Sequence, residues 1–208
     1  MATHSEDAAR TRLVEAAGEI FSEQGYESAT IREICTRAGA NVASVNYHFR
    51  DKLGLYSAVI RSLVPNSEMP SSDFGDPEDA LRAFISAMLA RLVLDDQGRQ
   101  WHLRIMVHEL ARPSEGLPVI VEELIGPRYS LLRSIISAIV GLPPEDDTVR
   151  LSAHSIIGQI AHYIHGRPVL GHVWPDMRFT PEQVAQIADH ISEFSLAGLR
   201  NIAGAIKS

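Results

Sequence analysis

The sequence contains very little cysteine: Cys35 is the single one among 208 residues. One cysteine excludes an internal disulfide framework and a zinc site built from several cysteines. Such a composition fits a protein in a reducing compartment.

Long hydrophobic runs are also missing. The best apolar stretch, 135–142, is interrupted by Ser137 and Gly141, whereas a membrane-spanning helix needs about 20 predominantly apolar residues. Residues 1–7 are polar and acidic, unlike a secretory signal, which has a positive end before an apolar stretch. We therefore expect a cytoplasmic protein with no membrane partner.

An excess of positive charge is missing too. The chain has 19 basic and 26 acidic residues and a net charge of −7, which argues against a surface covered with phosphate-binding groups. Residues 1–64 are nearly neutral, with seven basic and eight acidic residues, and the remainder has twelve and eighteen. The acidic excess therefore belongs to the C-terminal two thirds.

Helical periodicity is what the sequence has in abundance. Hydrophobic residues make up 45% and charged residues 22% of the chain, as in an ordinary globular protein. Apolar residues recur at helical spacing throughout, and no stretch shows the sustained alternation of a half-buried strand. We therefore predict an all-α fold of about nine helices.

Local signals divide the first 64 residues into four helices. Gly25 has the position of a left-handed residue that follows a helix, and Thr30 with Glu33 has the form of a capping box. Asn41 and Asp51 are each placed to cap the helix that comes next. The predicted helices span about 6–24, 30–38, 42–49 and 51–64.

A segment rich in proline, serine and aspartate, 65–77, marks the predicted domain boundary. It separates a domain of residues 1–64, which includes the linking helix 51–64, from a second domain of residues 65–208. In the second domain we expect helices near 78–95, 100–112, 117–140, 146–165 and 181–205. Pro127 should kink or split the third of these. Residues 166–181 should form a long connection, either at a dimer edge or as a flexible flap.

Two short helices joined by a glycine-containing turn, 30–38 and 42–49, have the form of a helix-turn-helix. Their apolar positions can share one small core: Ile31, Ile34, Cys35, Ala38, Val45 and Phe49. The other positions of the second helix then face outward or lie at the margin: Val42, Ala43, Ser44, Tyr47 and His48. This pattern indicates a DNA-binding unit.

Residues 16–56 form the continuous stretch AAGEIFSEQGYESATIREICTRAGANVASVNYHFRDKLGLY. It resembles the tetracycline-repressor (TetR) family of bacterial transcriptional regulators. The resemblance implies an all-helical homodimer with an N-terminal three-helix DNA-binding unit on a larger ligand-binding and dimerisation domain. Two positions depart from the family pattern. Asn46 belongs to an Asn-Tyr-His-Phe variant of the recognition helix, where the family often has an aromatic residue, and Arg50 replaces a frequent proline or lysine.

Three residues are expected to contact the phosphate backbone. Thr30 and Lys52 lie at helix starts that correspond to phosphate-contacting positions of the family, and His48 would also bind phosphate. Thr30 has the alternative role of a helix cap, which is compatible with the first. Local charge favours these contacts, because residues 28–52 contain four basic and two acidic residues.

Arg32, Ser44 and Tyr47 are expected to reach base edges or flanking phosphates in the major groove of double-stranded operator DNA. For Tyr47 the alternative is a ring packed in the core. Val42 and Ala43 offer only apolar contacts, for instance to thymine methyl groups, so direct readout would rest on few polar groups. Specificity would then depend partly on DNA shape.

The last two predicted helices carry apolar stripes with small residues among them. The stripes consist of Leu151, Ile156, Ile157, Ile160 and Ile164 in one helix, and Val184, Ile187, Ala188, Ile191, Phe194, Leu199 and Ile202 in the other. One face of each helix should form intrachain core. The family resemblance adds a four-helix homodimer interface on another face.

A small-molecule effector of unknown identity is the expected ligand. Six residues are candidates to line an apolar pocket with a few polar groups: Trp101, His102, Met106, Glu109, Tyr129 and His154. The alternative is ordinary core with a hydrogen-bonded histidine. No metal or cofactor is expected, because the chelating pair His162 and His165 has no third ligand.

The sequence therefore predicts a ligand-responsive transcriptional regulator, a repressor that binds a pseudo-palindromic operator as a homodimer and is released by its effector. An enzyme is the rival class. It is disfavoured because Gly-x-Ser-x-Gly, His-Glu-x-x-His and phosphate-binding glycine motifs are missing, and Cys35 lies among apolar residues. A DNA-binding dimer regulated by a protein partner, or without a small-molecule ligand, is the second alternative.

Overall fold

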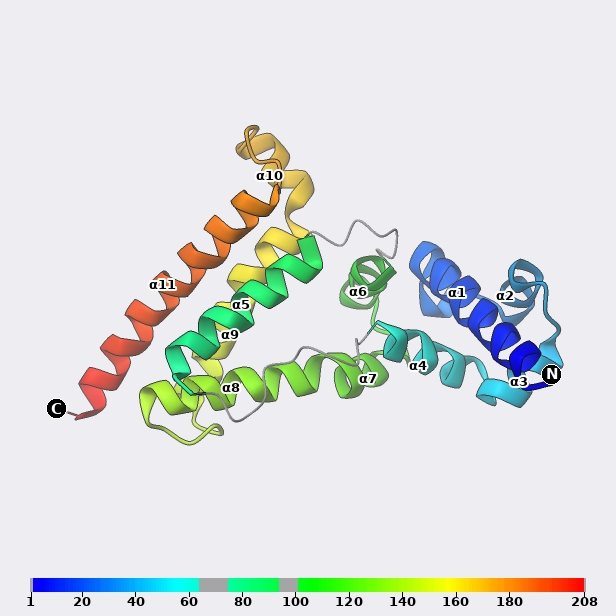
Figure 1. Cartoon of the computed structure of the whole chain (residues 1–208), viewed down its shortest axis with the longest axis horizontal. Coiled ribbons are helices and arrows are strands. Elements are labelled where there is room, and N and C mark those ends of the chain that lie inside the picture. Colours follow the sequence, from blue (N-terminus) through cyan, green and yellow to red (C-terminus); the bar gives the residue numbers. More distant parts are fainter. Residues whose placement is uncertain (1, 64–74, 94–100, 208) are drawn as a thin grey trace. The chain divides into compact units, whose positions relative to one another are not determined.

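The computed structural model describes residues 2–63, 75–93 and 101–207. Every regular element in these ranges is helical (Figure 1), so the predicted all-α fold is confirmed. No helix in the described ranges is both long and apolar enough to cross a membrane. The ranges form two compact units, one of residues 2–63 and 101–126 and one of residues 75–93 and 127–207.

The first unit begins with α1 (Ala2–Ser28), α2 (Ile31–Ala38), α3 (Val42–Phe49) and α4 (Lys52–Ser62). It also contains α6 (Trp101–Ala111), α7 (Leu117–Ile120) and the π-helical turn η1 (Val121–Ile125). α1 packs against α2, α4 and α6. Residues 101–126 therefore pack with the N-terminal helices, a grouping that the expected boundary at residue 65 did not anticipate.

Gly25 interrupts α1, as the sequence predicts. Its φ of 77° and ψ of 168° are not helical, although the bounds of α1 extend to Ser28. A Cβ atom on this residue would lie 3.2 Å from Nδ1 of His108 in α6. Both the backbone conformation and the close approach of α6 therefore favour glycine at this position.

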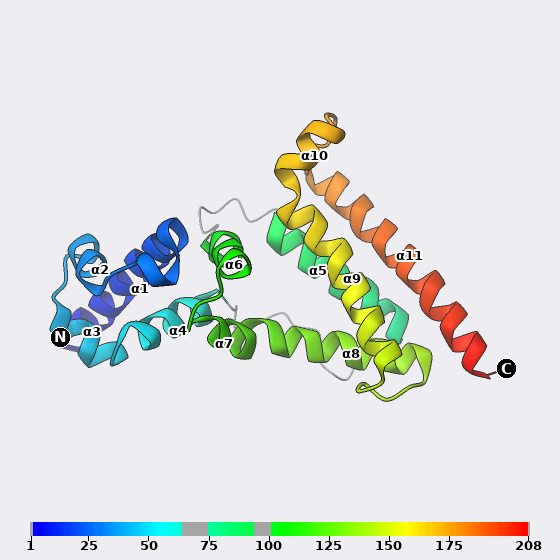
Figure 2. The same cartoon turned by 180° about the vertical axis from the view of Figure 1, so that it is seen from behind.

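The second unit consists of α5 (Pro77–Val93), α8 (Gly126–Val140, from Pro127), α9 (Asp147–His165), α10 (Arg167–Val173) and α11 (Pro181–Lys207). α5 packs along α11, and α9 contacts both of them (Figure 2). Ion pairs of Arg82 with Glu193, at 2.9 Å, and of Arg200 with Glu78 connect α5 to α11.

Pro127 is accommodated by a wide turn of the preceding helix. The structure divides the predicted helix 117–140 into α7, η1 and α8. The N–H of Gly126 donates to the carbonyl of Val121, a π-type bond. Because Pro127 has no N–H to continue the ordinary pattern, the π turn lets the chain pass the proline without a break.

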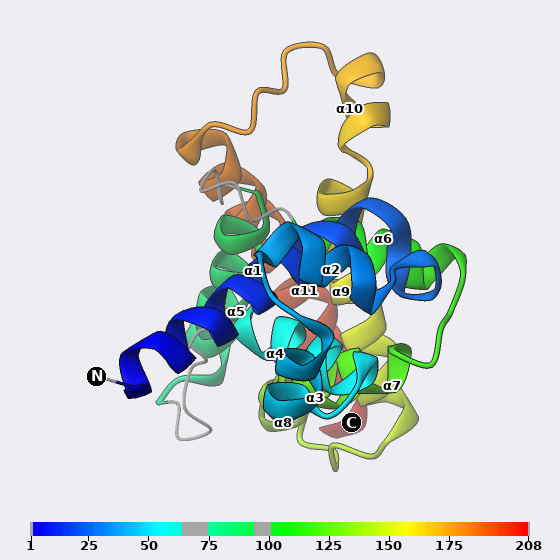
Figure 3. The ribbon, with the colours of Figure 1, turned by 90° about the vertical axis from the view of Figure 1, so that its right-hand side faces the viewer.

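The stretch 166–181 is not the long connection that the sequence predicts, because 167–173 form α10. Pro168 lies in the first turn of α10, where a missing N–H has no cost. The expected connection was therefore wrong for residues 167–173. Residues 174–180, between α10 and α11, are the actual connection, seen in Figure 3 as an extended segment.

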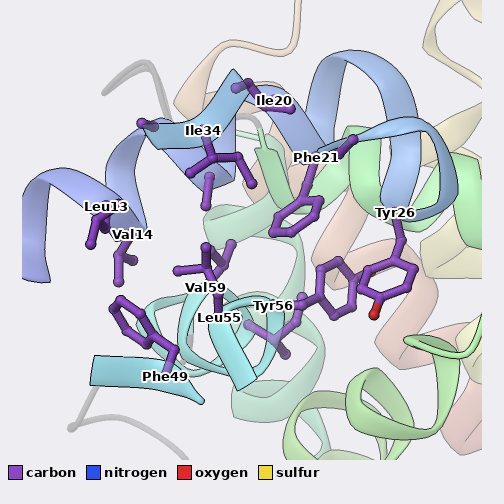
Figure 4. Packing of buried hydrophobic residues seen from close by; sticks show 14 of the residues in the cluster. Leu13, Val14, Ile20, Phe21, Tyr26, Ile34, Phe49, Leu55, Tyr56 and Val59 are labelled. Carbon is purple, nitrogen blue, oxygen red and sulfur yellow. The ribbon is translucent and has the colours of Figure 1, made fainter. Parts of the chain in front are cut away.

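The core of the first unit lies between α1 and the helix-turn-helix, and α4 closes it (Figure 4). The core predicted for the two short helices is confirmed: Ile34, Cys35, Ala38, Val45 and Phe49 are buried, and Ile31 is partly buried against them. An aromatic group extends this core, because the rings of Phe21 and Tyr26 each lie 4.9 Å from that of Tyr56.

Two tyrosine hydroxyls at the edge of this core donate to carboxylates. Tyr56 donates to Oε1 of the buried Glu109 at 3.2 Å, and Ser114 donates to the same carboxylate through its N–H and its hydroxyl. Tyr26 donates to Oε1 of Glu115 at 2.6 Å. These bonds connect α1 and α4 with α6 and the turn that follows it. Burial raises the pKa of Tyr26 and of Tyr56, and the two carboxylates raise them further.

The stability of the protein should fall at alkaline pH. A raised pKa keeps both tyrosines neutral in the folded state, whereas unfolded tyrosines ionise at about pH 10. The folded state then binds more protons, so the free energy of unfolding decreases as pH rises above about 10. Tyr56→Phe should make this decrease shallower in denaturant titrations between pH 8 and 11. The matched control is Tyr47→Phe, at an exposed ring; equal slopes for Tyr56→Phe and the wild type would contradict the expectation.

Candidate nucleic-acid interface

α2 begins at a complete capping box. The hydroxyl oxygen of Thr30 accepts from the N–H of Glu33, and the carboxylate of Glu33 accepts from the N–H of Thr30, both at 3.2 Å. The hydrogen bonds from Thr30 lower the pKa of Glu33. At the other end, Gly39 adopts φ 61°, the left-handed conformation that ends helices. The predicted start and end of this helix are confirmed.

α3 is capped by Asn41 and followed by a tight second turn. The side-chain oxygen of Asn41 accepts from the N–H of Ser44 at 2.8 Å and from its hydroxyl at 3.0 Å. Asp51 caps α4 by accepting from the N–H of Gly54 at 2.8 Å. A Cβ atom on Gly54 would lie 1.9 Å from the carbonyl oxygen of Phe49, so only glycine fits where α3 and α4 meet.

The two faces of α3 differ in their exposure to solvent. Val45 and Phe49 are buried in the core of the first unit. On the opposite side Tyr47 is 74% exposed and Val42 is 48% exposed, with Ala43 also at the surface. Exposure of the Tyr47 ring excludes the alternative in which it packs in the core. α3 therefore has an outer ridge of exposed side chains, formed by Val42, Ala43 and Tyr47, on a helix whose inner face is buried.

The predicted phosphate contacts lie around this ridge. Thr30 is exposed at the start of α2. Nζ of Lys52 lies 4.3 Å from the centre of the Tyr26 ring and donates to the carbonyl of Glu27, just before Thr30. His48 is half-buried beside Phe49, with the two ring centres 5.9 Å apart. Thr30 is thus exposed, and the partly exposed Lys52 is held near the end of α1 by Glu27 and Tyr26.

The positive charge near α2 and α3 is only partly neutralised. Arg37 pairs with Glu23 at 3.1 Å and with Glu19 at 3.5 Å, so its charge is largely compensated. The Arg50 side chain is 93% exposed, and its ion pair with Asp51 is 4.0 Å long. Arg32 is exposed on α2. Arg32, Arg50 and Lys52 are therefore among the local cations that an anionic partner would meet.

Two families match the chain. Residues 13–59 match the bacterial regulatory proteins of the tetR family. Residues 77–199, more than half of the chain, match the C-terminal domain of the HTH-type transcriptional dual regulator CecR. The chain belongs to the TetR family of transcriptional regulators. The family resemblance of residues 16–56 is thereby confirmed.

Relatives of this TetR-family protein cover most of its length. The dual regulator CecR of Shigella flexneri is 28% identical over 177 residues, 78% of each chain. The HTH-type transcriptional repressor NicS of Pseudomonas putida is 26% identical over 203 residues, 93% of each chain. A solved structure of the transcriptional regulator FadR from Bacillus subtilis, in complex with stearoyl-CoA, has a TM-score of 0.62 at 15% identity and covers 90% of this chain and 98% of FadR. That last likeness concerns the fold alone.

The six predicted ligand residues of the TetR-family protein are divided between the two compact units. Trp101, Met106 and Glu109 belong to the first unit, and Tyr129 and His154 belong to the second. The hydroxyl of Tyr129 lies 3.3 Å from Nε2 of His154. The side chain of the sixth residue, His102, lies outside the described residues.

Within the first unit, the three residues have different surroundings. Trp101 lines a cleft of about 660 Å³ between α1, α3, α4 and α6, together with Arg10 and His48. Met106 packs against the core, and Glu109 is 2% exposed. Glu109 already accepts hydrogen bonds from Tyr56 and Ser114, which gives it an internal structural role. Across the described residues, no group of three or more metal-ligating side chains comes together.

Sequence reasoning missed several residues of this region. It did not anticipate the bonds of Tyr26 and Tyr56 to carboxylates more than 50 positions away, because no local pattern signals a contact over that separation. It did not single out Arg10, whose guanidinium lies 5.6 Å from the centre of the Phe49 ring. It left the role of Asn46 open, although its outward position on α3 could have been inferred from the helical period.

Loss of the Thr30 cap should destabilise the first unit. Thr30→Ala removes the side-chain acceptor for the N–H of Glu33 and should lower the free energy of unfolding by about 1 kcal/mol. Thr30→Ser keeps the hydroxyl and is the matched control. Urea denaturation followed by circular dichroism measures the difference. Equal midpoints for Thr30→Ala and Thr30→Ser would show that the capping box does not contribute.

Proposed function

We propose that this TetR-family regulator is a ligand-responsive repressor that binds a pseudo-palindromic operator as a homodimer and is released by a small-molecule effector. The observation that carries the proposal is the outer ridge of α3, exposed on a helix whose inner face is locked into the core. A helix held in this way can enter the major groove with its side chains free. The repressor assignment is supported by the relative NicS, which is named a repressor.

Residues 1–64 are the DNA-binding domain in this proposal, with Asn-Tyr-His-Phe as its variant of the recognition helix, and residues 65–208 provide ligand binding and dimerisation. Thr30, Lys52 and His48 contact phosphates. Arg32, Ser44 and Tyr47 reach base edges or nearby phosphates. The negative net charge is no obstacle, because phosphate contacts need local cations and helix N-termini only. Binding to DNA also places the protein in the cytoplasm.

A homodimer through α9 and α11 is supported by a large apolar side chain that is exposed on each of these helices. Leu151 on α9 is 68% exposed and Phe194 on α11 is 67% exposed. Gly158 and Gly198 lie on the same two helices, and a Cβ atom on either would have nothing within 4 Å. Large apolar side chains beside open glycine positions let helices from a second copy approach closely. A dimer would carry two α3 helices to half-sites about 34 Å apart.

The effector is supported by two kinds of observation. FadR, which shares the fold, was solved in complex with stearoyl-CoA. Trp101 lines the cleft of the first unit, which offers a place where a ligand could bind, and Tyr129 with His154 forms a polar pair in the second unit. A thermal-stability screen of small molecules separates this proposal from the alternative of a protein-regulated dimer, because a compound raises the melting temperature only if it binds the folded protein.

Removal of the Tyr47 ring should abolish specific operator binding. Tyr47→Ala deletes an exposed side chain, so the helical content and the dimer should persist while the affinity for the operator falls to that for random duplex. Lys52→Ala is the comparison, since loss of a phosphate contact weakens binding to all sequences and lowers the salt slope by about one. Fluorescence anisotropy at several salt concentrations measures both effects. Unchanged operator affinity of Tyr47→Ala would remove this residue from the interface.

A charge in the proposed dimer face should produce monomers. Phe194→Glu places a carboxylate beside Gly198, where burial against a second copy would be unfavourable. Analytical ultracentrifugation should then give the monomer mass at concentrations where the wild type is dimeric. Leu110→Glu is the matched control, because Leu110 is 66% exposed on α6, which is not one of the two proposed interface helices. A dimeric Phe194→Glu protein would contradict the assignment of the interface.

A further inference from the structure

We propose that Asn46 selects one adenine in each half-site of the operator by binding the major-groove edge of that base. This inference rests on the proposed function, because it requires α3 to lie in the major groove. It goes beyond that function in naming the base and the residue that recognises it.

Most residues of α3 lack a polar group that is available for a bidentate contact with a base. Val42 and Ala43 are apolar. The hydroxyl of Ser44 donates to the side-chain oxygen of Asn41 at 3.0 Å, and its N–H is bound to the same atom. His48 is half-buried at the margin, in the cleft that contains Trp101. Asn46 and Tyr47 are what remains.

Asn46 is exposed, and its side-chain amide makes no hydrogen bond with any residue that the structure describes. Its backbone is fixed, because the carbonyl of Asn46 accepts from the N–H of Arg50 at 3.1 Å. The amide therefore projects from a rigid helix with one acceptor and two donor hydrogens available. Neither capping nor core packing explains an asparagine here, and asparagine is a poorer helix former than alanine.

The chemistry of the amide selects the base. An asparagine side chain can donate to N7 of adenine and accept from its N6 amino group at the same time, whereas no other base shows this pattern in the major groove. The phenol of Tyr47 has one hydroxyl and cannot form a bidentate contact. Asn46 is therefore the α3 residue best suited to discriminate between bases.

Val42 extends the prediction to a second base pair. It lies one helical turn before Asn46, on the same side of α3, and is 48% exposed. A separation of four residues corresponds to about 6 Å along the helix, or about two base-pair steps. A branched apolar side chain at that distance fits the methyl group of a thymine. Each half-site should thus contain a thymine within about two base pairs of the adenine.

The test begins with selection of duplexes from a random library by the full-length wild-type protein. The selected half-site should contain one invariant adenine. Asn46→Ala should bind this operator about 5- to 150-fold more weakly for each half-site, the range of a good bidentate contact, and should lose its preference at that position alone. Asn46→Asp is the second variant: its carboxylate only accepts hydrogen bonds, so the preference should change from adenine to cytosine.

Replacement of the adenine by 7-deazaadenine removes the N7 acceptor and tests the contact from the DNA side. The wild type should lose affinity for the modified operator, and Asn46→Ala should bind both operators equally. Lys52→Ala is the control: it should bind all duplexes more weakly but keep both the preference for adenine and the sensitivity to 7-deazaadenine. Circular dichroism of each variant checks that the helices are intact.

The outcomes separate the inference from the proposed function. If the wild type enriches an operator but Asn46→Ala keeps the same base preferences, or if 7-deazaadenine has no effect on the wild type, the inference about Asn46 is overturned and the proposed function stands. If the wild type enriches no duplex over competitor, the proposed function itself fails.

Discussion

Burial of the inner face of the helix-turn-helix is the constraint on which the rest of the structure depends. Ile34 and Val45 are completely buried, and Phe49 is nearly so. Each such side chain contributes about 1.5 to 3 kcal/mol relative to exposure, more than a helix cap or a surface ion pair contributes. Because burial of one face fixes the position of α3, the residues on its opposite face are not needed for packing and can contact DNA.

Helix caps and one glycine then fix the orientation of the short helices. Thr30, Asn41 and Asp51 each accept a backbone N–H at a helix start. Gly54 allows the carbonyl of Phe49 to approach closer than any side chain would permit. Farther away, the bond of Tyr56 to the buried Glu109 attaches α4 to α6. Residues 101–126 are therefore joined to the DNA-binding helices by polar contacts as well as by apolar packing.

What the sequence predicted well depended on short-range physics. The three caps, the break at Gly25 and the division of α3 into a buried and an exposed face follow from residue types a few positions apart, and the structure confirms them. The sequence did not predict α10, although a proline such as Pro168 is well tolerated in the first turn of a helix. The packing of residues 101–126 with the first unit could not be predicted, because it depends on contacts between distant residues.

In the candidate site, too, some features follow from short-range sequence patterns and others depend on contacts between distant residues. The exposed position of Tyr47 followed from the period of the helix, whereas the commitment of Glu109 to Tyr56 and Ser114 required coordinates. Trp101 and the pair of Tyr129 with His154 belong to different units, a grouping that helical periodicity does not encode. That the side-chain amide of Asn46 makes no hydrogen bond with the described residues likewise depends on its neighbours in space and not on its own sequence context.

The most direct test of the account is the capture of genomic DNA fragments by the purified full-length protein at about physiological salt, with the protein-to-site ratio determined on the enriched duplex. The account predicts one pseudo-palindromic sequence, occupied by two copies whose protected half-sites lie about one helical turn apart on the same side of the duplex. Retention of all fragments in equal proportion, or a single copy bound to each site, would contradict it.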